Sequence, residues 1–223
     1  AADLAVNTWL LNGFQSSFPS ANWHILSEEN VKDDFKKDLP FKHEWMWIID
    51  PLDGTKDFLK GSGEYAVHLG LVHNNKPILG VVLIPECEEL WFGVMGSGTW
   101  YEDRMGNKNF PSFSGRIKNN EMILVASRSH RDENLEKLIA RMQFLETKAI
   151  GSIGCKICSI LKGESDIYIS LSGKTAPKDW DLAGPEAVLR AAGGEFTHAN
   201  QQELLYNQSD FAQHGCLIAT HGK

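Results

Sequence analysis

The sequence is poor in several features that mark well-known classes of protein. It has only four cysteines in 223 residues, which excludes a disulfide-stapled scaffold and is typical of a reducing cytoplasm. No apolar run approaches the roughly 20 residues of a membrane span, and no stretch has the pattern of a signal peptide. Basic residues number 22 against 29 acidic ones, a net charge of -7, which argues against nucleic acid or an anionic membrane as the main partner. We therefore expect a cytoplasmic monomer or homodimer that binds a small molecule.

Two of the cysteines lie three positions apart. Cys155-Lys156-Ile157-Cys158 matches the C-x-x-C pattern of redox and zinc sites. No second C-x-x-C and no pair of histidines completes a zinc set in the sequence. Because free cysteine is usually a core residue, we interpret both as small apolar residues on a helix.

What the sequence does have is a large apolar fraction, 42%, which is ample for a sizeable core. The apolar run over 45–49 predicts a buried strand, and the pattern over 65–101 predicts an antiparallel meander. From residue 121 onward strands and helices alternate, which indicates an α/β arrangement. A polar, turn-rich segment over 111–120 separates the two textures, so we divide the chain into parts 1–118 and 119–223. Helices are predicted over 1–14, 132–142, 153–162 and 180–192.

The most informative stretch is WIIDPLDGTKDF, residues 47–58. Asp50 ends the apolar run, and Pro51 and the Asp53-Gly54 pair predict a turn that stops the strand. Two acids three positions apart at such a turn can converge on one point, where buried carboxylates repel each other. A hard cation such as Mg²⁺ removes that cost because it takes oxygen ligands. The stretch therefore predicts a metal site rather than a plain turn.

Two further acidic segments join this stretch. Glu28 and Glu29 follow a predicted strand end, and Asp181 lies at a predicted helix start, where an acid is equally consistent with a helix cap. Carboxylates from three segments suit two magnesium ions that clamp the attacking and leaving oxygens of a phosphoryl transfer. A haloacid-dehalogenase phosphatase is a competing interpretation of Asp53-Gly54-Thr55. That family has D-x-D-G-T, and the spacing here is one residue longer.

These segments resemble one known family. Residues 50–55, DPLDGT, resemble the D-P-[IL]-D-G-T signature of the inositol monophosphatase superfamily, and residues 180–185, WDLAGP, resemble its second signature. Ser27-Glu28-Glu29 resembles its [GS]-E-E element, and order and spacing agree along essentially the whole chain. The resemblance implies an α/β layered fold, the αβαβα sandwich of the sugar-phosphatase type. Within the superfamily, Lys56-Asp57-Phe58, residues 127–130 and Pro185-Glu186 resemble the bacterial type of 3'(2'),5'-bisphosphate nucleotidase.

The resemblance also implies roles for particular residues. Glu28, Asp50 and the backbone carbonyl of Leu52 are expected to hold a first magnesium ion, and Asp50, Asp53 and Asp181 a second. Glu28 could also serve a third, weaker ion. Asp3 matches the acid of the family's T-x-A-D element and is expected to orient Thr55. Thr55 and Glu28 would then position and deprotonate the attacking water.

A second set of residues is expected to bind the substrate. Residues 151–156 resemble the family's nucleotide-contacting G-S-x-x-K stretch, although Gly154 stands where many members have serine. For Lys156 a solvated surface position is equally consistent with the sequence, and for Lys174 and Lys178 it is the better interpretation. His130 could contact the substrate or cap a helix, and we interpret His68 as a packing or surface residue. The expected substrate contacts are Glu28, Leu52, Asp53, Gly54, Thr55, His130, Ser152, Lys156 and Asp181.

The function implied by the resemblance is magnesium-dependent removal of the 3'-phosphate from adenosine 3',5'-bisphosphate, with 3'-phosphoadenylyl sulfate as a further substrate and with inhibition by lithium. The alternative enzyme is an inositol or sugar phosphatase on the same fold. A non-catalytic phosphate-binding protein is disfavoured, because a binder needs no water-activating Thr55 and Asp3. The chain opens on Ala1, and the family's helical hairpin before the T-x-A-D element is not in the sequence. We therefore expect further N-terminal residues in the natural protein.

Overall fold

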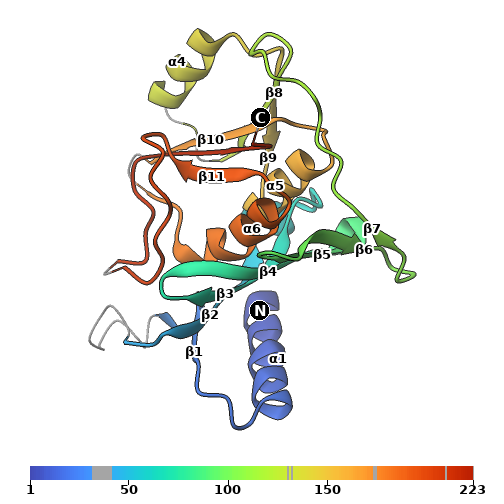
Figure 1. Cartoon of the computed structure of the whole chain (residues 1–223), viewed down its shortest axis with the longest axis vertical. Coiled ribbons are helices and arrows are strands. Elements are labelled where there is room, and N and C mark those ends of the chain that lie inside the picture. The colour runs from blue at the N-terminus through green and yellow to red at the C-terminus, as the bar shows by residue number, and fades with distance from the viewer. Residues whose placement is uncertain (32–41, 130, 132, 173–174, 209, 223) are drawn as a thin grey trace.

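The chain folds into five alternating layers of helix and sheet (Figure 1). The computed structural model describes residues 1–31, 42–129, 131, 133–172, 175–208 and 210–222. A seven-stranded sheet is covered by α1 on one face, two helices lie between it and a five-stranded sheet, and α4 covers the far side. This is the αβαβα sandwich that the resemblance predicts. The layer-forming helices are α1 (Ala2–Ser17), α4 (Glu133–Met142), α5 (Ile153–Leu161) and α6 (Asp179–Ala191).

The seven-stranded sheet runs in the order of the sequence. β1 pairs with β2 in parallel, and every later pair is antiparallel, as the predicted meander requires. Asn74 and Asn75 both have positive φ, 48° and 63°, which suits the tight turn between β3 and β4. Its strands are β1 (His24–Ser27), β2 (Trp45–Asp53), β3 (Ala66–His73), β4 (Lys76–Ile84), β5 (Glu89–Val94), β6 (Gly98–Glu102) and β7 (Lys108–Asn109). Short helices follow two of them, α3 (Thr55–Lys60) after β2 and η1 (Pro85–Cys87) after β4.

The prediction that the strand over 45–49 ends at Asp50 is wrong. β2 continues through Pro51 to Asp53, because the ladder with β3 contains a bulge. Asp50 pairs with His68, whereas Asp53 pairs with Ala66, so three steps along β2 match two along β3. The local ladder is interrupted there, and the strand therefore tolerates proline, which has no N–H to donate. The bulge also brings Asp50 and Asp53 to one face of the sheet, which residues three apart on a regular strand do not share.

The second sheet has the order β11-β12-β10-β8-β9. β8 pairs in parallel with β9 and β10, and β12 pairs antiparallel with β10 and β11. The chain passes from one sheet to the other between Asn109 and Ile123, a stretch that contains the polar segment 111–120. One buried cluster joins side chains from both sheets, so the division into two parts stays a prediction. The strands are β8 (Ile123–Ser127), β9 (Glu146–Ile150), β10 (Ile167–Leu171), β11 (Glu195–His198) and β12 (Cys216–Thr220).

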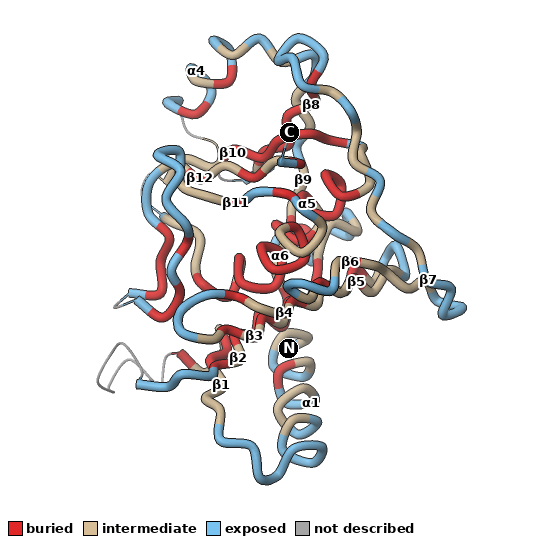
Figure 2. The backbone as a smooth tube through the Cα atoms, viewed as in Figure 1, coloured by how far each residue is buried: buried red, intermediate tan, exposed pale blue. Residues whose placement is uncertain are grey.

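Helix α6 is pressed into the seven-stranded sheet. Buried residues concentrate along α5, α6 and the strands on either side of them (Figure 2). A Cβ added at Gly80 on β4 would lie 2.2 Å from the carbonyl oxygen of Gly184, and one at Gly93 on β5 would lie 2.4 Å from Cα of Val188. Only glycine fits at these two positions, because the helix backbone lies against the strand backbone. This close approach brings the start of α6 against β2.

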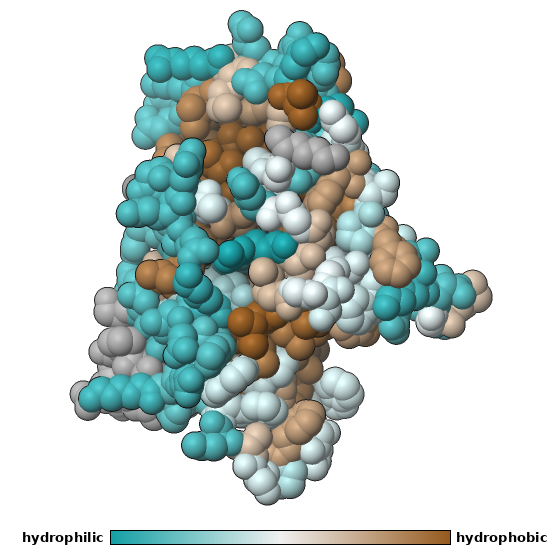
Figure 3. Space-filling view, in the orientation of Figure 1, coloured by the Kyte–Doolittle hydropathy of each residue, from teal (hydrophilic) through white to brown (hydrophobic). Residues whose placement is uncertain are grey.

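Apolar side chains also reach the surface. The face seen in Figure 3 is hydrophilic along much of its rim, with hydrophobic patches between the layers. Leu4 and Trp9 on α1 and Phe18 directly after it are exposed, and Asn7 is the helix's buried residue. Single exposed apolar residues are normal. Among the residues that the structure describes, no helix combines the length and apolar character needed to cross a bilayer.

Candidate metal and substrate site

Three aspartates meet where the bulge of β2 faces the start of α6. Asp50, Asp53 and Asp181 each offer an oxygen, and these oxygens lie within 4.8 Å of one another. Asp50 is 1% exposed, and burial together with its acidic neighbours Asp53 and Asp181 raises its pKa well above the usual range. Burial, followed by the charge of Asp53, raises the pKa of Asp181 to about 8. Acids held together in this way favour a cation between them.

The orientation of each aspartate is fixed by a donor outside the cluster. Oδ1 of Asp50 accepts from the N–H of Leu52 at 2.9 Å, and Oδ2 of Asp181 accepts from the N–H of Lys178 at 2.7 Å. Oδ2 of Asp53 accepts from the hydroxyl of Ser152 at 2.6 Å. The available metal ligands are oxygen atoms of closely spaced carboxylates, that of Asp50 buried and those of Asp53 and Asp181 partly buried, and carboxylate oxygen is the ligand type that Mg²⁺ takes. The residues present therefore fit a divalent cation, held by Asp50, Asp53 and Asp181.

Glu28 stands beside this cluster. It follows β1, and its N–H donates to the carbonyl of Ile49 at 3.2 Å. Burial raises the pKa of Glu28, Glu29 and Asp53 raise it further, and a hydrogen bond with Asp50 opposes the shift. Of the two glutamates in the Ser27-Glu28-Glu29 element, Glu28 is therefore the one that interacts with the aspartates, as the resemblance implies.

Asp3 and Thr55 are engaged differently from the expectation. Oδ1 of Asp3 accepts from the N–H of Leu4 at 3.0 Å. The Thr55 hydroxyl donates to the carbonyl oxygen of Leu52 at 3.1 Å. Within the described residues no hydrogen bond joins Asp3 to Thr55. The predicted role of Asp3 in orienting Thr55 stays a prediction.

Gly54 makes the turn between these elements possible. Its φ is +86°, in the left-handed region, and a Cβ there would lie 2.9 Å from the carbonyl oxygen of Glu64. Both observations require glycine at this position. Helix α3 then starts at Thr55, directly beside the aspartates.

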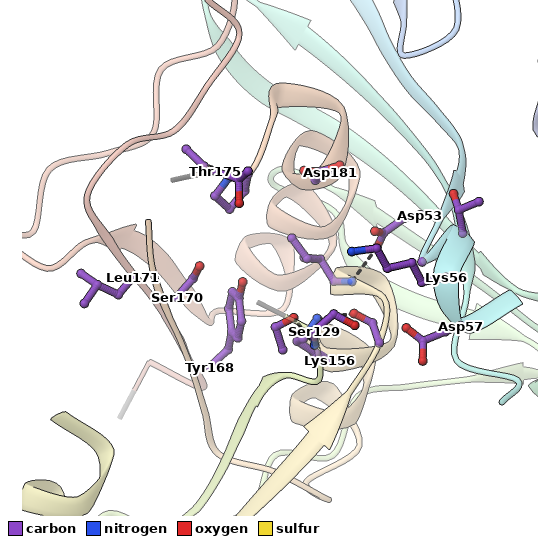
Figure 4. A pocket seen from close by; sticks show the side chains of 17 residues that line it. Asp53, Lys56, Asp57, Ser129, Lys156, Tyr168, Ser170, Leu171, Thr175 and Asp181 are labelled. Carbon is purple, nitrogen blue, oxygen red and sulfur yellow. Dashed lines mark hydrogen bonds between the residues drawn. The ribbon is translucent and has the colours of Figure 1, made fainter. Parts of the chain in front are cut away.

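A cavity of about 290 Å³ opens beside the cluster. Figure 4 shows Asp53, Lys56 and Asp57 on one side of it and Tyr168, Ser170 and Leu171 on the other. Its size and mixed apolar and polar lining are close to those of a site for a small ligand. The remaining lining residues are Gly54, Thr55, Ser127, Ser129, Gly151, Ile153, Lys156, Thr175, Ala176, Pro177 and Asp181.

Lys156 lines the cavity and is not a surface lysine. It is 1% exposed, its Nζ donates to the carbonyl of Gly151 at 2.6 Å, and it lies 5.6 Å from the centre of the Tyr168 ring. Burial lowers its pKa, while the nearby Asp53 opposes that shift. The alternative of a solvated position is therefore wrong. A buried ammonium in a cavity wall is well placed to meet an anion.

In the part of the chain that the structure describes, the other basic candidates for substrate binding are not brought to the cavity wall beside Lys156. Nζ of Lys178 donates to the carbonyl of Asp210 at 3.0 Å. Lys174 and His130 lie outside the described residues. Ser152 donates to Asp53 and caps α5, and its expected contact with the substrate stays a prediction.

Sequence reasoning did not foresee an arginine that ties the cavity walls together. Arg128, at the end of β8, donates to Oδ1 of Asp57 at 3.2 Å and to Oε1 of Glu64 at 2.7 Å. Oε2 of Glu64 in turn accepts from the N–H of Gly151 at 2.7 Å. Asp57 and Arg128 both belong to stretches that mark the nucleotidase branch. Their sequence positions do not show that they pair.

The C-x-x-C pair lies on helix α5, as interpreted. All four cysteines in the chain are free thiols in the structure. Burial raises the pKa of Cys155 to about 12, and its Sγ contacts the carbonyl of Tyr65 at 3.7 Å. A thiol with so high a pKa is poorly suited to redox chemistry.

The comparisons with known proteins settle the family. The model of the inositol monophosphatase family matches residues 1–223. The chain belongs to this family. The resemblance noted on its two signature stretches is confirmed, and so is the layered α/β fold expected from it.

Relatives in the inositol monophosphatase family include several bisphosphate nucleotidases. The 3'(2'),5'-bisphosphate nucleotidase CysQ of Salmonella typhimurium is 32% identical over 195 residues, which cover 86% of this chain and 73% of that protein. The CysQ of Buchnera aphidicola is 31% identical over 216 residues, which cover 96% of this chain and 77% of that protein. Both come from the branch that Lys56-Asp57-Phe58 resembles.

Solved structures of the family have the same fold. The crystal structure of CysQ from Bacteroides thetaiotaomicron superposes with a TM-score of 0.77 and 28% identity, covering 95% of this chain and 82% of that one. The IMPase of Thermotoga maritima also gives a TM-score of 0.77, at 22% identity, over 99% of this chain and 77% of that one. The latter likeness concerns the fold alone.

Proposed function

We propose that the chain is a magnesium-dependent phosphomonoesterase that removes the 3'-phosphate of adenosine 3',5'-bisphosphate. The observation that carries this proposal is the convergence of Asp50, Asp53 and Asp181 at the edge of a cavity that also holds a buried lysine. A metal site built from these three carboxylates suits phosphoryl transfer to water. The nucleotidase relatives support the substrate class.

The residues around the cluster divide the work of hydrolysis. Bound magnesium supplies a water of lowered pKa and offsets charge on the phosphate. Glu28, which lies beside the cluster and whose pKa is raised by burial, is suited to accept the proton of the attacking water. The hydroxyl of Thr55, held against the carbonyl of Leu52, would fix the position of that water. Asp3 is assigned to the same water-positioning group on the family's pattern.

The other end of the cavity suits the remainder of the nucleotide. Lys156 and Lys56 line it and would meet the negative charge of a second phosphate. Tyr168, Leu171 and Pro177 offer apolar surface to a base. Neutral inositol hydroxyls would give the two lysines no second charge to balance. We therefore favour a bisphosphorylated substrate, with 3'-phosphoadenylyl sulfate in the same class, and a cytoplasmic site of action.

A substrate panel tests the proposal. Phosphate release from adenosine 3',5'-bisphosphate, inositol 1-phosphate and fructose 1,6-bisphosphate is measured with Mg²⁺, with the Asp50→Asn variant as the matched control. We expect the bisphosphate nucleotide to be preferred, with adenosine 5'-monophosphate as product and inhibition by Li⁺. Preference for inositol 1-phosphate would overturn the branch assignment. A phosphorylated enzyme trapped during turnover would favour the dehalogenase mechanism instead.

A further inference from the structure

A fully buried histidine lies against the aspartate cluster. His68 is on β3, opposite Asp50 in the ladder, and is 0% exposed. Within the described part of the chain, neither of its ring nitrogens has a hydrogen-bond partner of ordinary geometry. Its Nε2 lies 3.5 Å from Oδ2 of Asp53. Buried polar groups in folded proteins are nearly always paired, so this ring calls for an explanation.

The space for the ring is provided by Gly154. A Cβ at this position would lie 2.3 Å from Nε2 of His68 and 2.9 Å from Cγ1 of Val82. Real Cβ atoms do not approach other atoms so closely. The histidine can therefore reach Asp53 only because residue 154 has no side chain, and the two residues form a matched pair.

The surroundings of the ring decide what it offers to Asp53. Nε2 faces Oδ2 of Asp53 at 3.5 Å, and because a carboxylate oxygen accepts hydrogen bonds, this contact favours an N–H over a lone pair on Nε2. Oδ2 of Asp53 already accepts from Ser152 at 2.6 Å and from the N–H of Ile153 at 2.5 Å. His68 approaches the same oxygen from β3, whereas these two donors come from the start of α5.

We propose that His68 is a positioning residue for Asp53, which it holds through Nε2–H, and that Gly154 is the residue that admits the ring. The inference rests on the proposed function, since Asp53 matters in this way only if it binds the metal. Partners that orient a metal ligand typically contribute about 10–100-fold to metal affinity. His68 therefore joins the site as a residue that acts through Asp53.

Two variants of similar size separate this role from simple packing. His68→Gln places an amide N–H near the position of Nε2, whereas His68→Met fills the space without a donor. Mn²⁺ binding to the metal-free protein is measured by titration calorimetry, beside thermal melting of each variant. We expect His68→Met to weaken Mn²⁺ binding by about 10–100-fold and His68→Gln by far less. Equal loss in both variants, or none in either, would overturn the proposal.

The glycine provides a test that leaves the histidine in place. In Gly154→Ala the new methyl group must displace the ring, so Mn²⁺ binding should weaken as in His68→Met. Adding Gly154→Ala to His68→Met should then cause little further loss, and full additivity of the two losses would argue against a shared contact. If the unaltered protein bound no Mn²⁺ at all, the proposed function itself would fail, which is a distinguishable result.

Discussion

Two aspartates that lie two positions apart at the start of α6 have opposite surroundings. Asp179 is satisfied by the protein: Oδ2 accepts from the N–H of Asn207 at 2.6 Å and Oδ1 from Nε2 of Gln213 at 2.9 Å. Asp181 faces two further carboxylates, those of Asp50 and Asp53. Burial raises the pKa of Asp179 to about 6 and that of Asp181 to about 8. The first turn of α6 thus carries Asp179, whose partners are protein groups, and Asp181, whose carboxylate neighbours favour a bound metal ion.

Glu186, one turn further along α6, belongs with Asp179. It is fully buried, yet Arg190 donates to its Oε1 at 3.0 Å and the hydroxyl of Tyr206 donates to its Oε2. The chain therefore supplies partners for buried acids elsewhere on this helix. At the aspartate cluster each carboxylate also accepts a hydrogen bond, but no lysine or arginine side chain donates to the three within the described residues and they lie against one another, which is costly unless a cation binds. The contrast supports the proposal that the cluster binds a cation.

Of the four substitutions, Asp50→Asn should have the largest effect, because it removes a carboxylate from the aspartate cluster. Loss of several kcal/mol of electrostatic stabilisation from a metal site lowers kcat by on the order of 10³-fold. The metal-free variant should unfold at a higher temperature than the unaltered protein, because one of the repelling charges is gone. Activity assays and thermal melting in a chelator measure the two effects. Turnover near that of the unaltered protein would contradict the assignment of Asp50 as a ligand.

Asp179→Ala should have the opposite signature. The N–H of Asn207 and the amide of Gln213 lose their acceptor, and each unsatisfied buried donor costs about 1–3 kcal/mol of unfolding free energy. Mn²⁺ binding to the folded variant should fall much less than in Asp50→Asn. Urea unfolding and calorimetry on the same samples would show it. If Asp179→Ala stabilised the metal-free protein, the distinction between the two acids would be lost.

Arg128→Met tests an acid that lies at the cavity but is paired by the protein. Asp57 would lose its guanidinium partner, and the tie between α3 and the Gly151 turn would be broken. We expect a loss of about 1 kcal/mol in stability, since the arginine is partly exposed. KM for the substrate should rise more than kcat falls, because the change alters a cavity wall and leaves the cluster intact. Arg128→Lys keeps the charge but not the planar guanidinium group. Its KM in steady-state kinetics should lie between that of the unaltered protein and that of Arg128→Met.

Glu186→Gln should have the smallest effect, visible in the pH dependence of stability. Burial raises the pKa of Glu186 from 4.5 to about 7, so the folded protein keeps a proton there that the unfolded chain releases earlier. Its contribution to the free energy of unfolding is therefore complete below about pH 4.5 and is lost as the pH rises through about 7. In the variant this part of the fall should be absent. Urea unfolding at pH 5 and pH 8 gives the change in unfolding free energy with pH for each protein. An identical change in the unaltered protein and in Glu186→Gln would contradict a raised pKa for Glu186.

The sequence predicts the local elements well and the long-range pairs poorly. Apolar periodicity locates α4, which has one buried face, whereas α5 and α6 lie between the two sheets and are identified by their apolar content, because most of their residues are buried. The DPLDGT and WDLAGP stretches predict the acid cluster because burying like charges has few other purposes. The contact of Arg128 with Asp57 joins residues 71 positions apart, and that of His68 with Gly154 spans a similar separation. No periodicity records which partner a residue meets.

The error at Pro51 has a similar cause. The expectation that proline ends a strand rests on its inability to donate to a ladder. That rule assumes a regular ladder, and the bulge makes the donor unnecessary. Lys156 illustrates the same limit, since a lysine is normally exposed and only the fold shows that it lies inside a cavity. In both cases the tertiary arrangement overrides a sound local expectation.

The bulge in β2 makes the number of residues between the two aspartates a fixed property of this protein. On a regular strand, acids separated by a single residue would already face the same way, whereas acids separated by two would not. With Pro51 and Leu52 between them, Asp50 and Asp53 share a face only through the extra step in the ladder with β3. A deletion of one residue here would either rotate Asp53 away from α6 or remove the bulge and move Asp53 to a new ladder partner. Most connections in a protein tolerate changes of length, but this two-residue spacer cannot be shortened or lengthened without rebuilding the site around it.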